Sequence, residues 1–369
     1  MSEANADGVG GLRLLRARGA PHPRPLPATR FARGGRGEEG AHGRLCTVFA
    51  ALALSLALSS PALAQPAPAA DWPTRPIRMI VPLPAGSAVD IVARMLAQKL
   101  GQRHGQTFVV ENRAGASGAI GTEVIVRAPA DGYTIGMATS TTLATGPVLN
   151  PKLPYDPVKD LAPVALVGVS PYLLVAHPSV PAKSVAELIA LAKSKPGALS
   201  YSSVGEASLA HLAGLLFSSM AGVEFTHIPY KSSSNAVIDL MEGRIDLQFS
   251  ILPTTQQHLR TGKLRALAVT TEKRLDELPD VPTLAESGLA GFEATLWFAV
   301  VAPKNVPPAV IARLNREIIA AIADPDVKSA WAAQGIFPEG STPAELRERV
   351  VRDIAKWRTV VARFNLKAE

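Results

Sequence analysis

Cysteine and aromatic residues are scarce in this chain. Of its 369 residues, one is a cysteine, Cys46, and 5% are aromatic. Because Cys46 lies in the N-terminal leader described below, the rest of the chain has no thiol nucleophile. The sequence has no G-x-S-x-G motif, and His227 and His258 have no cysteine, aspartate or histidine at metal-ligand spacing. We therefore predict that the protein is not an enzyme and holds no catalytic residue, metal ion or cofactor.

A strong excess of charge is also missing from most of the chain. The formal net charge is +7, but eight of the 38 basic residues and only four of the 31 acidic residues lie in residues 1–64. The remainder is close to neutral and has no basic run and no basic patch interleaved with aromatic residues. Nucleic acids attract dense positive charge, so we expect no nucleic-acid partner.

An apolar run at residues 45–58 is 14 residues long, too short to span a bilayer comfortably. Arg44 precedes it, and the small residues of Ala62-Leu63-Ala64 follow it. These flanks are typical of a signal peptide, whereas the alternative is a short buried helix. We predict a leader over residues 1–64, cleavage after Ala64 and location in the periplasm. Residues 1–43 form an unusually long segment before the signal peptide, and we interpret this segment as lying upstream of the true translation start.

Beyond residue 72, short β-rich runs alternate with helical patterns. Several runs are apolar throughout, as expected of strands that helices cover on both faces. Ser87-x-x-Asp90 begins a capped helix that should end near Gly101, and Ser184-x-x-Glu187 begins another. The expected strands are residues 77–83, 107–111, 133–138, 163–168, 172–177, 199–203, 225–230, 247–252, 264–270 and 295–302. The expected C-terminal helices are residues 307–323, 325–334 and 342–364.

This alternation predicts an α/β fold with two mostly parallel sheets flanked by helices. The chain is also too long for one typical compact domain. We place lobe 1 at residues 72–170 and 295–369, and lobe 2 at residues 171–294. The chain then crosses between the lobes twice, near residues 168–173 and 293–297. Two crossing strands form a hinge, and the cleft between the lobes is the expected ligand site.

Many blocks of the chain, in order, resemble one receptor family. They are Trp72-Pro73-x-Arg75-Pro76-Ile77, Val81-Pro82-Leu83-Pro84-Ala85-Gly86-x-x-x-Asp90, Val110-Glu111-Asn112-Arg113-x-Gly115-x-x-Gly118, Asp131-Gly132-Tyr133-Thr134, Leu153-Pro154-Tyr155-Asp156-Pro157, His177-Pro178-Ser179-Val180-Pro181, His227-x-Pro229-Tyr230-Lys231, Gly262-Lys263-Leu264-Arg265-Ala266 and Leu278-Pro279-Asp280-Val281-Pro282-Thr283. The resemblance covers residues 72–366, and so many ordered blocks are more specific than any single motif. The chain is similar to the substrate-binding receptors of tripartite tricarboxylate transporters, the Bug/TctC family.

The resemblance implies a bilobed periplasmic-binding-protein fold of type II and a receptor that captures a small organic carboxylate. The solute would be a dicarboxylate, a tricarboxylate, an amino acid or an aromatic acid, and the partners would be membrane permease subunits. We expect a monomer. The alternative is a periplasmic sensory receptor that passes a ligand signal to a membrane signalling protein, since both roles need only closure driven by the ligand.

The first candidate ligand segment is the loop at residues 83–87, which joins an apolar strand to a capped helix. Its backbone N–H groups and the helix N-terminus suit an anion, and in the family this loop binds a ligand carboxylate. The candidates here are Leu83, Ala85, Gly86 and Ser87. Leu83, Ala85 and Ser87 depart from the family's usual Phe-Pro-Pro-Gly-Gly pattern, which leaves the solute open. Asp90 is interpreted as a helix cap, because a carboxylate there would repel an anion.

Hydroxyl groups and turns follow several other strands. The further candidates are Ser140, Thr141, Ser203, Gly205, Ser208, Tyr230 and Ser250. Hydroxyls at the carboxyl ends of parallel strands suit a solute, while ordinary helix capping is the alternative for residues 139–142. The loops at residues 83–87, 139–142 and 202–208 contain no arginine or lysine, so N–H groups, hydroxyls, helix N-termini and water must hold the carboxylate. Glu206 lies in the last loop and would favour an amino-bearing ligand.

Two further features are interpreted as packing. His211 lies three residues after Ser208 and so on the same helix face, where we expect a hydrogen-bonded packing histidine. Gly115, Gly118 and Gly121 are spaced by three residues and lack the G-x-G-x-x-G order. We therefore predict a turn with close helix packing at these glycines in preference to a nucleotide site.

Overall fold

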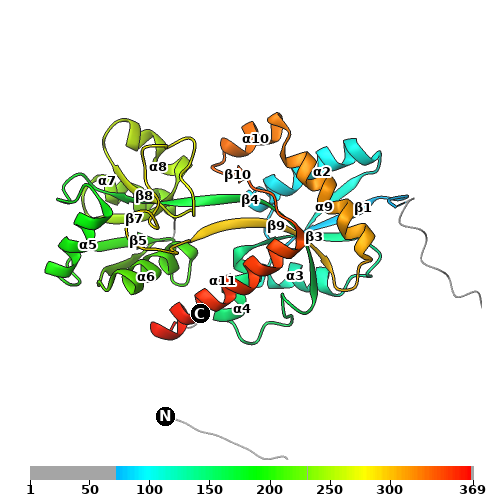
Figure 1. Ribbon diagram of the computed structural model, residues 1–369, viewed down its shortest axis with the longest axis horizontal. Coiled ribbons are helices and arrows are strands. Elements are labelled where there is room, and N and C mark those ends of the chain that lie inside the picture. The colour runs from blue at the N-terminus through cyan, green and yellow to red at the C-terminus, as the bar shows by residue number, and fades with distance from the viewer. Residues whose placement is uncertain (1–71, 231, 367–369) are drawn as a thin grey trace, which may run out of the picture. The chain divides into compact units, whose positions relative to one another are not determined.

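The computed structural model describes residues 72–230 and 232–366. The predicted leader, with its apolar run at residues 45–58 and the segment 1–43, lies outside these residues. Figure 1 shows two groups of strands and helices joined by two long strands, β4 (Leu161–Ala176) and β9 (Thr295–Pro303). The α/β bilobed fold expected from the sequence is confirmed.

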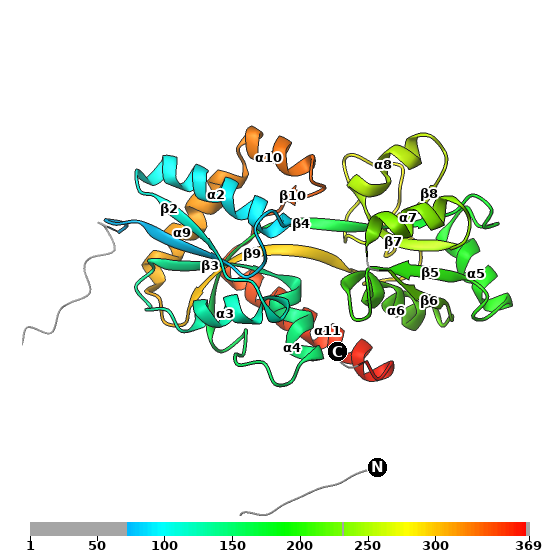
Figure 2. The same ribbon diagram turned by 180° about the vertical axis from the view of Figure 1, so that it is seen from behind.

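The first group, lobe 1, is built on β1 (Ile77–Val81), β2 (Phe108–Asn112) and β3 (Thr134–Thr139). β1 pairs in parallel with both β2 and β3, because helices return the chain to the same end of the sheet between these strands. Figure 2 shows these strands from behind, with their helices around them. The helical segments before β4 are α2 (Ala88–His104), η1 (Ala116–Gly118), α3 (Ala119–Val126), η2 (Thr141–Thr145) and α4 (Gly146–Leu149). After β9 follow α9 (Pro308–Ile322), α10 (Pro325–Ala332), β10 (Phe337–Pro338) and α11 (Pro343–Arg363).

The second group, lobe 2, repeats the same construction. Its strands are β5 (Ser200–Ser203), β6 (Thr226–Pro229), β7 (Leu247–Ile251) and β8 (Arg265–Val269). Its helices are α5 (Val185–Ser194), α6 (Leu209–Ala221), α7 (Ser233–Met241) and α8 (Leu252–Arg260). β5 pairs in parallel with β6 and with β7, so the carboxyl ends of these strands meet at one edge.

The sheet is continuous through the two crossing strands, in the order β2-β1-β3-β9-β4-β7-β5-β6, with β8 and β10 also paired to β4. Every antiparallel pair involves β4 or β9. The expected parallel pairing therefore applies to the strands that helices connect, and each lobe has a mixed sheet. The reason is that one crossing strand leaves lobe 1 and the other returns, so the two run in opposite directions.

The strands at residues 163–168 and 172–177, which the sequence suggested were separate, are one 16-residue strand, β4. Pro171 has no N–H to donate, which disfavours a position inside a sheet. In the structure it lies where β4 changes partners, since residues 161–171 pair with β9 and residues 172–176 pair with β7 and β8. A proline is tolerated at that point, and the strand continues from one lobe into the other.

The predicted helix caps at Ser87 and Ser184 are confirmed, and Thr342 caps a third helix in the same way. The hydroxyls of Ser87, Ser184 and Thr342 each accept a backbone N–H in the first turn of α2, α5 and α11. α2 continues past Gly101 to His104, because the left-handed glycine that ends it is Gly105, with φ of 64°. Across the described ranges, the search for a helix that could cross the apolar part of a membrane finds none.

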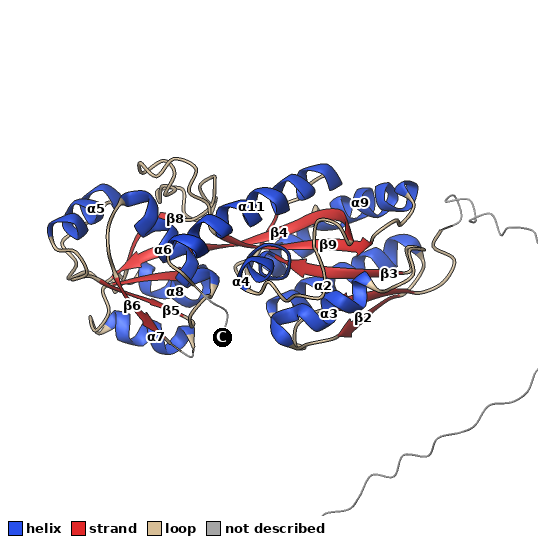
Figure 3. Ribbon diagram, turned by 90° about the horizontal axis from the view of Figure 1, so that it is seen from below, coloured by secondary structure: helices blue, strands red, loops and turns tan. Residues whose placement is uncertain are grey.

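The C-terminal helix α11 runs along the crossing strands and reaches α6 of lobe 2 (Figure 3). Near its middle it encloses the carboxylate of Glu293, which is 5% exposed and lies just before β9. Arg349 and Lys356 of α11 approach this carboxylate to 2.6 Å and 2.9 Å. Lys356 also contacts Asp353, which accepts a 2.8 Å hydrogen bond from the indole N–H of Trp297 in β9. Buried charges thus tie α11 to the start of the returning strand.

Replacing Glu293 with glutamine should destabilise the protein strongly at neutral pH. Burial disfavours ionisation, but the charges of Lys356 and Arg349 outweigh it and lower the pKa of Glu293 from 4.5 to about 2. Breaking such a buried ion pair leaves two cations without their acceptor, so we expect a loss of about 3–5 kcal/mol in the free energy of unfolding. Urea denaturation at pH 7 measures it.

The loss of stability caused by Glu293→Gln should depend on pH. Because the pKa of Glu293 is lower in the folded chain than in the unfolded one, its contribution is complete above about pH 4.5 and disappears as pH falls toward 2. The difference between wild type and Glu293→Gln should therefore shrink at pH 3. Glu272→Gln, an exposed glutamate in the same region, is the control and should change stability little. Equal effects of the two substitutions would contradict the role given to Glu293.

Candidate functional site

The loop at residues 83–87 is braced from below by Asp90 and Asn112. The Asp90 carboxylate is buried and accepts hydrogen bonds from the Gly86 N–H, the Arg94 guanidinium and the Asn112 amide, each at 2.9 Å. The Asn112 amide also donates to the Leu83 carbonyl at 3.0 Å. Burial raises the pKa of Asp90, but these hydrogen bonds and the charge of Arg94 lower it below its usual value. Asp90 therefore acts as a brace for the loop, in agreement with its interpretation as a cap.

Two of the loop N–H groups that were expected to face an anion already have acceptors. The Gly86 N–H donates to Asp90, and the Ser87 N–H donates to the Pro84 carbonyl at 3.3 Å. The N–H groups of Ala88 and Val89, in the first turn of α2, have no helical acceptor by position and remain the donors of this segment. The sequence could not show this, because the brace comes from Asn112 at the end of another strand.

The spaced glycines allow helix α3 to lie directly against this loop. A Cβ atom on Gly121 would stand 2.6 Å from the Cα of Pro82, and one on Gly118 would stand 2.7 Å from Cγ2 of Thr142. Both distances are shorter than real Cβ contacts allow, so only glycine permits the approach. The prediction of close packing at these glycines is confirmed, and their role is to seat two candidate ligand segments side by side.

In the segment after β3, some hydroxyls cap the backbone and others have no such partner. The hydroxyl of Thr142 accepts the Thr139 N–H at 3.0 Å, and the hydroxyl of Thr139 accepts the Thr142 N–H at 3.3 Å. The Ser140 hydroxyl is buried without a partner among the described residues, while Thr141 lines a pocket. Thr139 and Thr142 therefore cap the backbone, and the hydroxyls of Ser140 and Thr141 remain available to donate to a solute.

The segment after β5 is a tightly held turn. The hydroxyls of Ser203 and Ser208 both lie within hydrogen-bond distance of the Gly205 carbonyl, at 2.9 Å and 2.8 Å. Ser203 is also 2.7 Å from Nε2 of His227. Gly205 has φ of 112° and Ala207 has φ of 56°, so the backbone is in the left-handed region on both sides of Glu206. Ser203, Gly205 and Ser208 thus shape the turn, whose other residues are the ones free to meet a solute.

Two stacked histidines support this turn from within lobe 2. The rings of His211 and His227 lie 3.8 Å apart and are nearly parallel. Nδ1 of His211 accepts the Ala207 N–H at 3.0 Å, which requires an unprotonated nitrogen. Burial, with a smaller effect of the neighbouring His227, lowers the pKa of His211 to about 4. The interpretation of His211 as a hydrogen-bonded packing histidine is confirmed.

The last two candidates have partners inside lobe 2. The Tyr230 hydroxyl donates to the Asp239 carboxylate at 2.6 Å, and the Ser250 hydroxyl lies 2.9 Å from the Thr254 hydroxyl. Neither residue lines the pocket described next, and neither does the loop at residues 83–87, Ser140, Ser203 or Gly205. A hydroxyl at the end of a strand was the signal for both, but the following helices, α7 and α8, supply nearer acceptors.

A pocket of about 570 Å³ lies between segments of the two lobes. The lining residues from lobe 1 are Ala116, Ser117, Ala119, Thr141, Thr142, Thr145, Gly146, Leu149, Asn150, Leu153 and Tyr155, and those from lobe 2 are Glu206, Ala207, Ser208 and Leu209. Of the predicted site residues, Thr141 and Ser208 are among them. Asn150 and Tyr155 were missed because they follow a short helix and no strand end marks them. Tyr155 donates to the Thr142 carbonyl at 2.9 Å, which fixes one wall.

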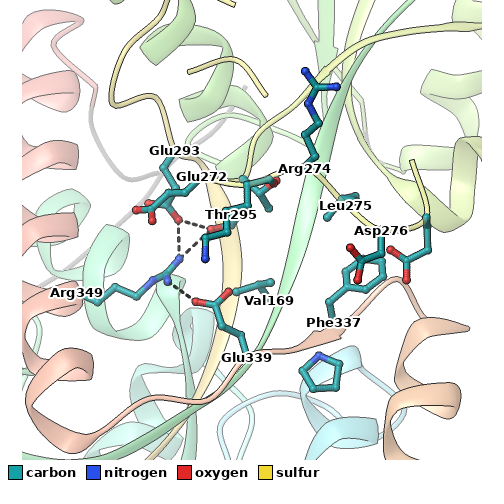
Figure 4. A pocket seen from close by; sticks show the side chains of 14 residues that line it. Val169, Glu272, Arg274, Leu275, Asp276, Glu293, Thr295, Phe337, Glu339 and Arg349 are labelled. Carbon is teal, nitrogen blue, oxygen red and sulfur yellow. Dashed lines mark hydrogen bonds and ion pairs between the residues drawn. The ribbon is translucent and has the colours of Figure 1, made fainter. Parts of the chain in front are cut away.

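A second pocket, of about 380 Å³, lies beside the crossing strands (Figure 4). It includes Glu293, Thr295 and Arg349 of the buried ion network, with Glu339 paired to Arg349 at 3.1 Å. Glu293, Arg349 and Glu339 are paired with one another, and these ion pairs connect α11 to the start of β9, while Lys273, Asp276 and Glu277 also line this pocket. In the described part of the chain, no group of three or more histidine, cysteine, aspartate or glutamate residues could hold a metal ion.

Comparison with known proteins decides the family. Residues 92–366 match the family described as "Tripartite tricarboxylate transporter family receptor". The chain belongs to this receptor family. Protein BugT of Bordetella pertussis is 40% identical over 315 residues, which are 85% of this chain and 97% of BugT.

Solved structures of similar proteins agree with this assignment. R. palustris Rpa4515, solved with adipate, is 38% identical, with a TM-score of 0.63 over 79% of this chain and 98% of its own. MatC from Rhodopseudomonas palustris, solved with bound malate, is 30% identical, with a TM-score of 0.61 over 79% of this chain and 100% of its own. The receptor family consists of extracytoplasmic solute-binding proteins, so the protein is a solute-binding receptor and not an enzyme.

Replacing Asn112 with alanine should loosen the loop at residues 83–87. The substitution removes the donor to the Leu83 carbonyl and one of the donors to buried Asp90. An unsatisfied buried polar group costs about 1–3 kcal/mol, and we expect a loss of that size in the free energy of unfolding. Hydrogen exchange at residues 83–87 should also accelerate. Gln98→Ala, on the exposed side of α2, is the control. If Asn112→Ala has no larger effect than Gln98→Ala, Asn112 does not brace the loop.

His211 should make the stability of the receptor depend on pH below neutrality. The unfolded chain binds a proton at this histidine near pH 6.5, whereas the folded chain binds it only near pH 4. Stability is therefore complete above pH 6.5 and falls as pH drops toward 4. His211→Gln should lose part of this slope while remaining folded at pH 7. Denaturation across this range tests it, and an unchanged slope would refute the assignment.

Proposed function

We propose that the protein captures a small organic carboxylate outside the cytoplasmic membrane and delivers it to the membrane permease subunits of a tripartite tricarboxylate-type transporter. The observation that carries the proposal is the pocket of about 570 Å³ lined by loops of both lobes. Membership of the receptor family supports transport as the role, and two similar receptors were solved with the dicarboxylates adipate and malate.

The pocket suits a carboxylate that is held by dipoles. Its described lining has no arginine and no lysine, but it offers the hydroxyls of Thr141 and Thr145 and the amide of Asn150. The N-terminus of α6, with the positive end of the helix dipole, also opens on it through Ser208 and Leu209. The Ser208 hydroxyl caps the His211 N–H, and the N–H groups of Leu209 and Ala210 have no helical acceptor by position. Such donors satisfy an anion without a counter-ion, in the way that helix N-termini bind phosphate and carboxylate groups.

Solute contacts in both lobes favour a closed receptor. Lobe 1 contributes the segment after β3, and lobe 2 contributes the turn after β5, so a bound solute links the two. We place the lobes at residues 72–170 with 295–369 and at residues 171–294, and the motion at the crossing strands β4 and β9. A ligand that gains contacts only on closure shifts the population to the closed state.

Export belongs to the same proposal. The leader at residues 1–64 would direct the chain to the periplasm and be removed after Ala64, which leaves a monomeric receptor. The family supports the compartment, since its members are extracytoplasmic receptors. Mass spectrometry of the periplasmic protein measures the N-terminus, and a retained leader would contradict this part of the proposal.

Removing the Thr141 hydroxyl should weaken carboxylate binding. Thr141→Val keeps the size of the side chain and loses one donor to the anion, so we expect affinity to fall about tenfold to a hundredfold. Calorimetry with adipate and malate, after a thermal-shift screen of further mono-, di- and tricarboxylates and amino acids, measures this. Thr359→Val, the same change on an exposed face of α11, is the control and should bind like wild type.

The salt dependence of the affinity distinguishes a carboxylate held by dipolar groups from one held by an ion pair. Because the donors are hydroxyls and backbone groups inside a pocket, affinity should change little between low and moderate ionic strength. A steep fall with added salt would indicate a cationic site and overturn this description of the pocket. If no carboxylate raises the melting temperature, the proposed function itself is wrong.

A further inference from the structure

The pocket between the lobes contains one charged side chain among its described lining residues, Glu206. In the part of the chain that the structure describes, Glu206 has no hydrogen bond and no ion pair, whereas most carboxylates in the lobes are paired. A lone carboxylate is an unfavourable neighbour for a purely anionic solute, because like charges repel more strongly as a site closes and water leaves. Glu206 is exposed, so water can solvate its charge in the empty pocket, and a solute that displaces this water has to supply a partner.

The backbone on both sides of Glu206 is fixed. Gly205 and Ala207 have positive φ angles, and the Gly205 carbonyl accepts the hydroxyls of Ser203 and Ser208. The Ala207 N–H is held by Nδ1 of His211, which is itself stacked on His227. Ala207 adopts a conformation that a residue with a Cβ atom rarely takes. The turn is thus built to present residue 206 at one place on the lobe 2 wall.

The opposite wall has the complementary character. Lobe 1 contributes the hydroxyls of Thr141 and Thr145 and the amide of Asn150, and its described lining residues carry no charge. A solute with one anionic and one cationic end can place its carboxylate against these donors and its cation against Glu206. Its two ends would then bridge the lobes.

We propose that Glu206 is a specificity-determining residue that binds an ammonium group of the solute, and that the receptor takes amino-bearing carboxylates. This inference rests on the proposed function and narrows it to one class of solute. Charge-assisted hydrogen bonds between an ammonium group and a carboxylate are about twice as strong as neutral ones, so the preference is large enough to measure.

The test compares solutes that differ only by an amino group. Aspartate with succinate, glutamate with glutarate, and 2-aminoadipate with adipate are measured by calorimetry on the purified chain. Wild type should bind the amino member of at least one pair about tenfold or more tighter than its partner. Glu206→Gln should weaken the amino member about tenfold to a hundredfold and leave the other member equal or stronger. Glu224→Gln, the same charge change at an exposed site in lobe 2, should do neither.

The outcomes separate the inference from the proposed function. If the acids without an amino group bind tighter to wild type, and Glu206→Gln strengthens them further, the inference is overturned while carboxylate capture stands. If Glu206→Gln weakens both members equally and lowers the melting temperature of the unliganded protein, Glu206 supports the turn and does not select the solute. If none of the six compounds binds and no other carboxylate does, the proposed function and the inference both fail.

Discussion

The buried carboxylate of Glu293 is the point on which the two-lobed arrangement depends. It lies just before β9, the strand that returns to lobe 1, and Arg349 and Lys356 of α11 enclose it. α11 in turn packs on β4 and reaches α6 in lobe 2. A network of this kind fixes geometry more than it adds net stability, because the desolvation of each charge offsets much of the attraction. Its effect is to fix α11 against the crossing strands β4 and β9.

Two of the candidate ligand segments are braced by hydrogen bonds within their own lobes, although of the two only the turn around Glu206 lines the pocket between the lobes. In lobe 1, Asp90 accepts a hydrogen bond from the Gly86 N–H and Asn112 donates one to the Leu83 carbonyl of the loop at residues 83–87. In lobe 2, the histidine stack and two serines do the same for the turn around Glu206. A braced loop loses little conformational entropy on binding, so more of the interaction energy with the solute remains as affinity. Some residues do both, since Ser208 braces the turn around Glu206 and also lines the pocket, whereas Asp90, Asn112 and Ser203 brace without lining it.

This division explains why several serines named from the sequence have structural partners. Ser203, Ser208 and Ser250 follow strands, as solute-binding hydroxyls often do, yet each has an acceptor within its own lobe. Thr141 follows a strand too, but Thr139 and Thr142 have already capped the next turn and leave it facing the pocket. Position at a strand end is thus shared by both kinds of residue, and hydrogen-bond partners distinguish them.

The sequence alone determined the α/β class, most strand positions, the helices capped by Ser87 and Ser184, the C-terminal helices, and the receptor family. These follow from local periodicity and from contiguous motifs, which need no knowledge of distant contacts. The tertiary structure decided which loops meet. It joined two predicted strands into β4, brought Asn150 and Tyr155 to the pocket, and placed Asn112 under the loop at residues 83–87. It also made Glu206 the one charged residue in the described lining of that pocket, because most of the other lining residues come from a segment far away in the chain.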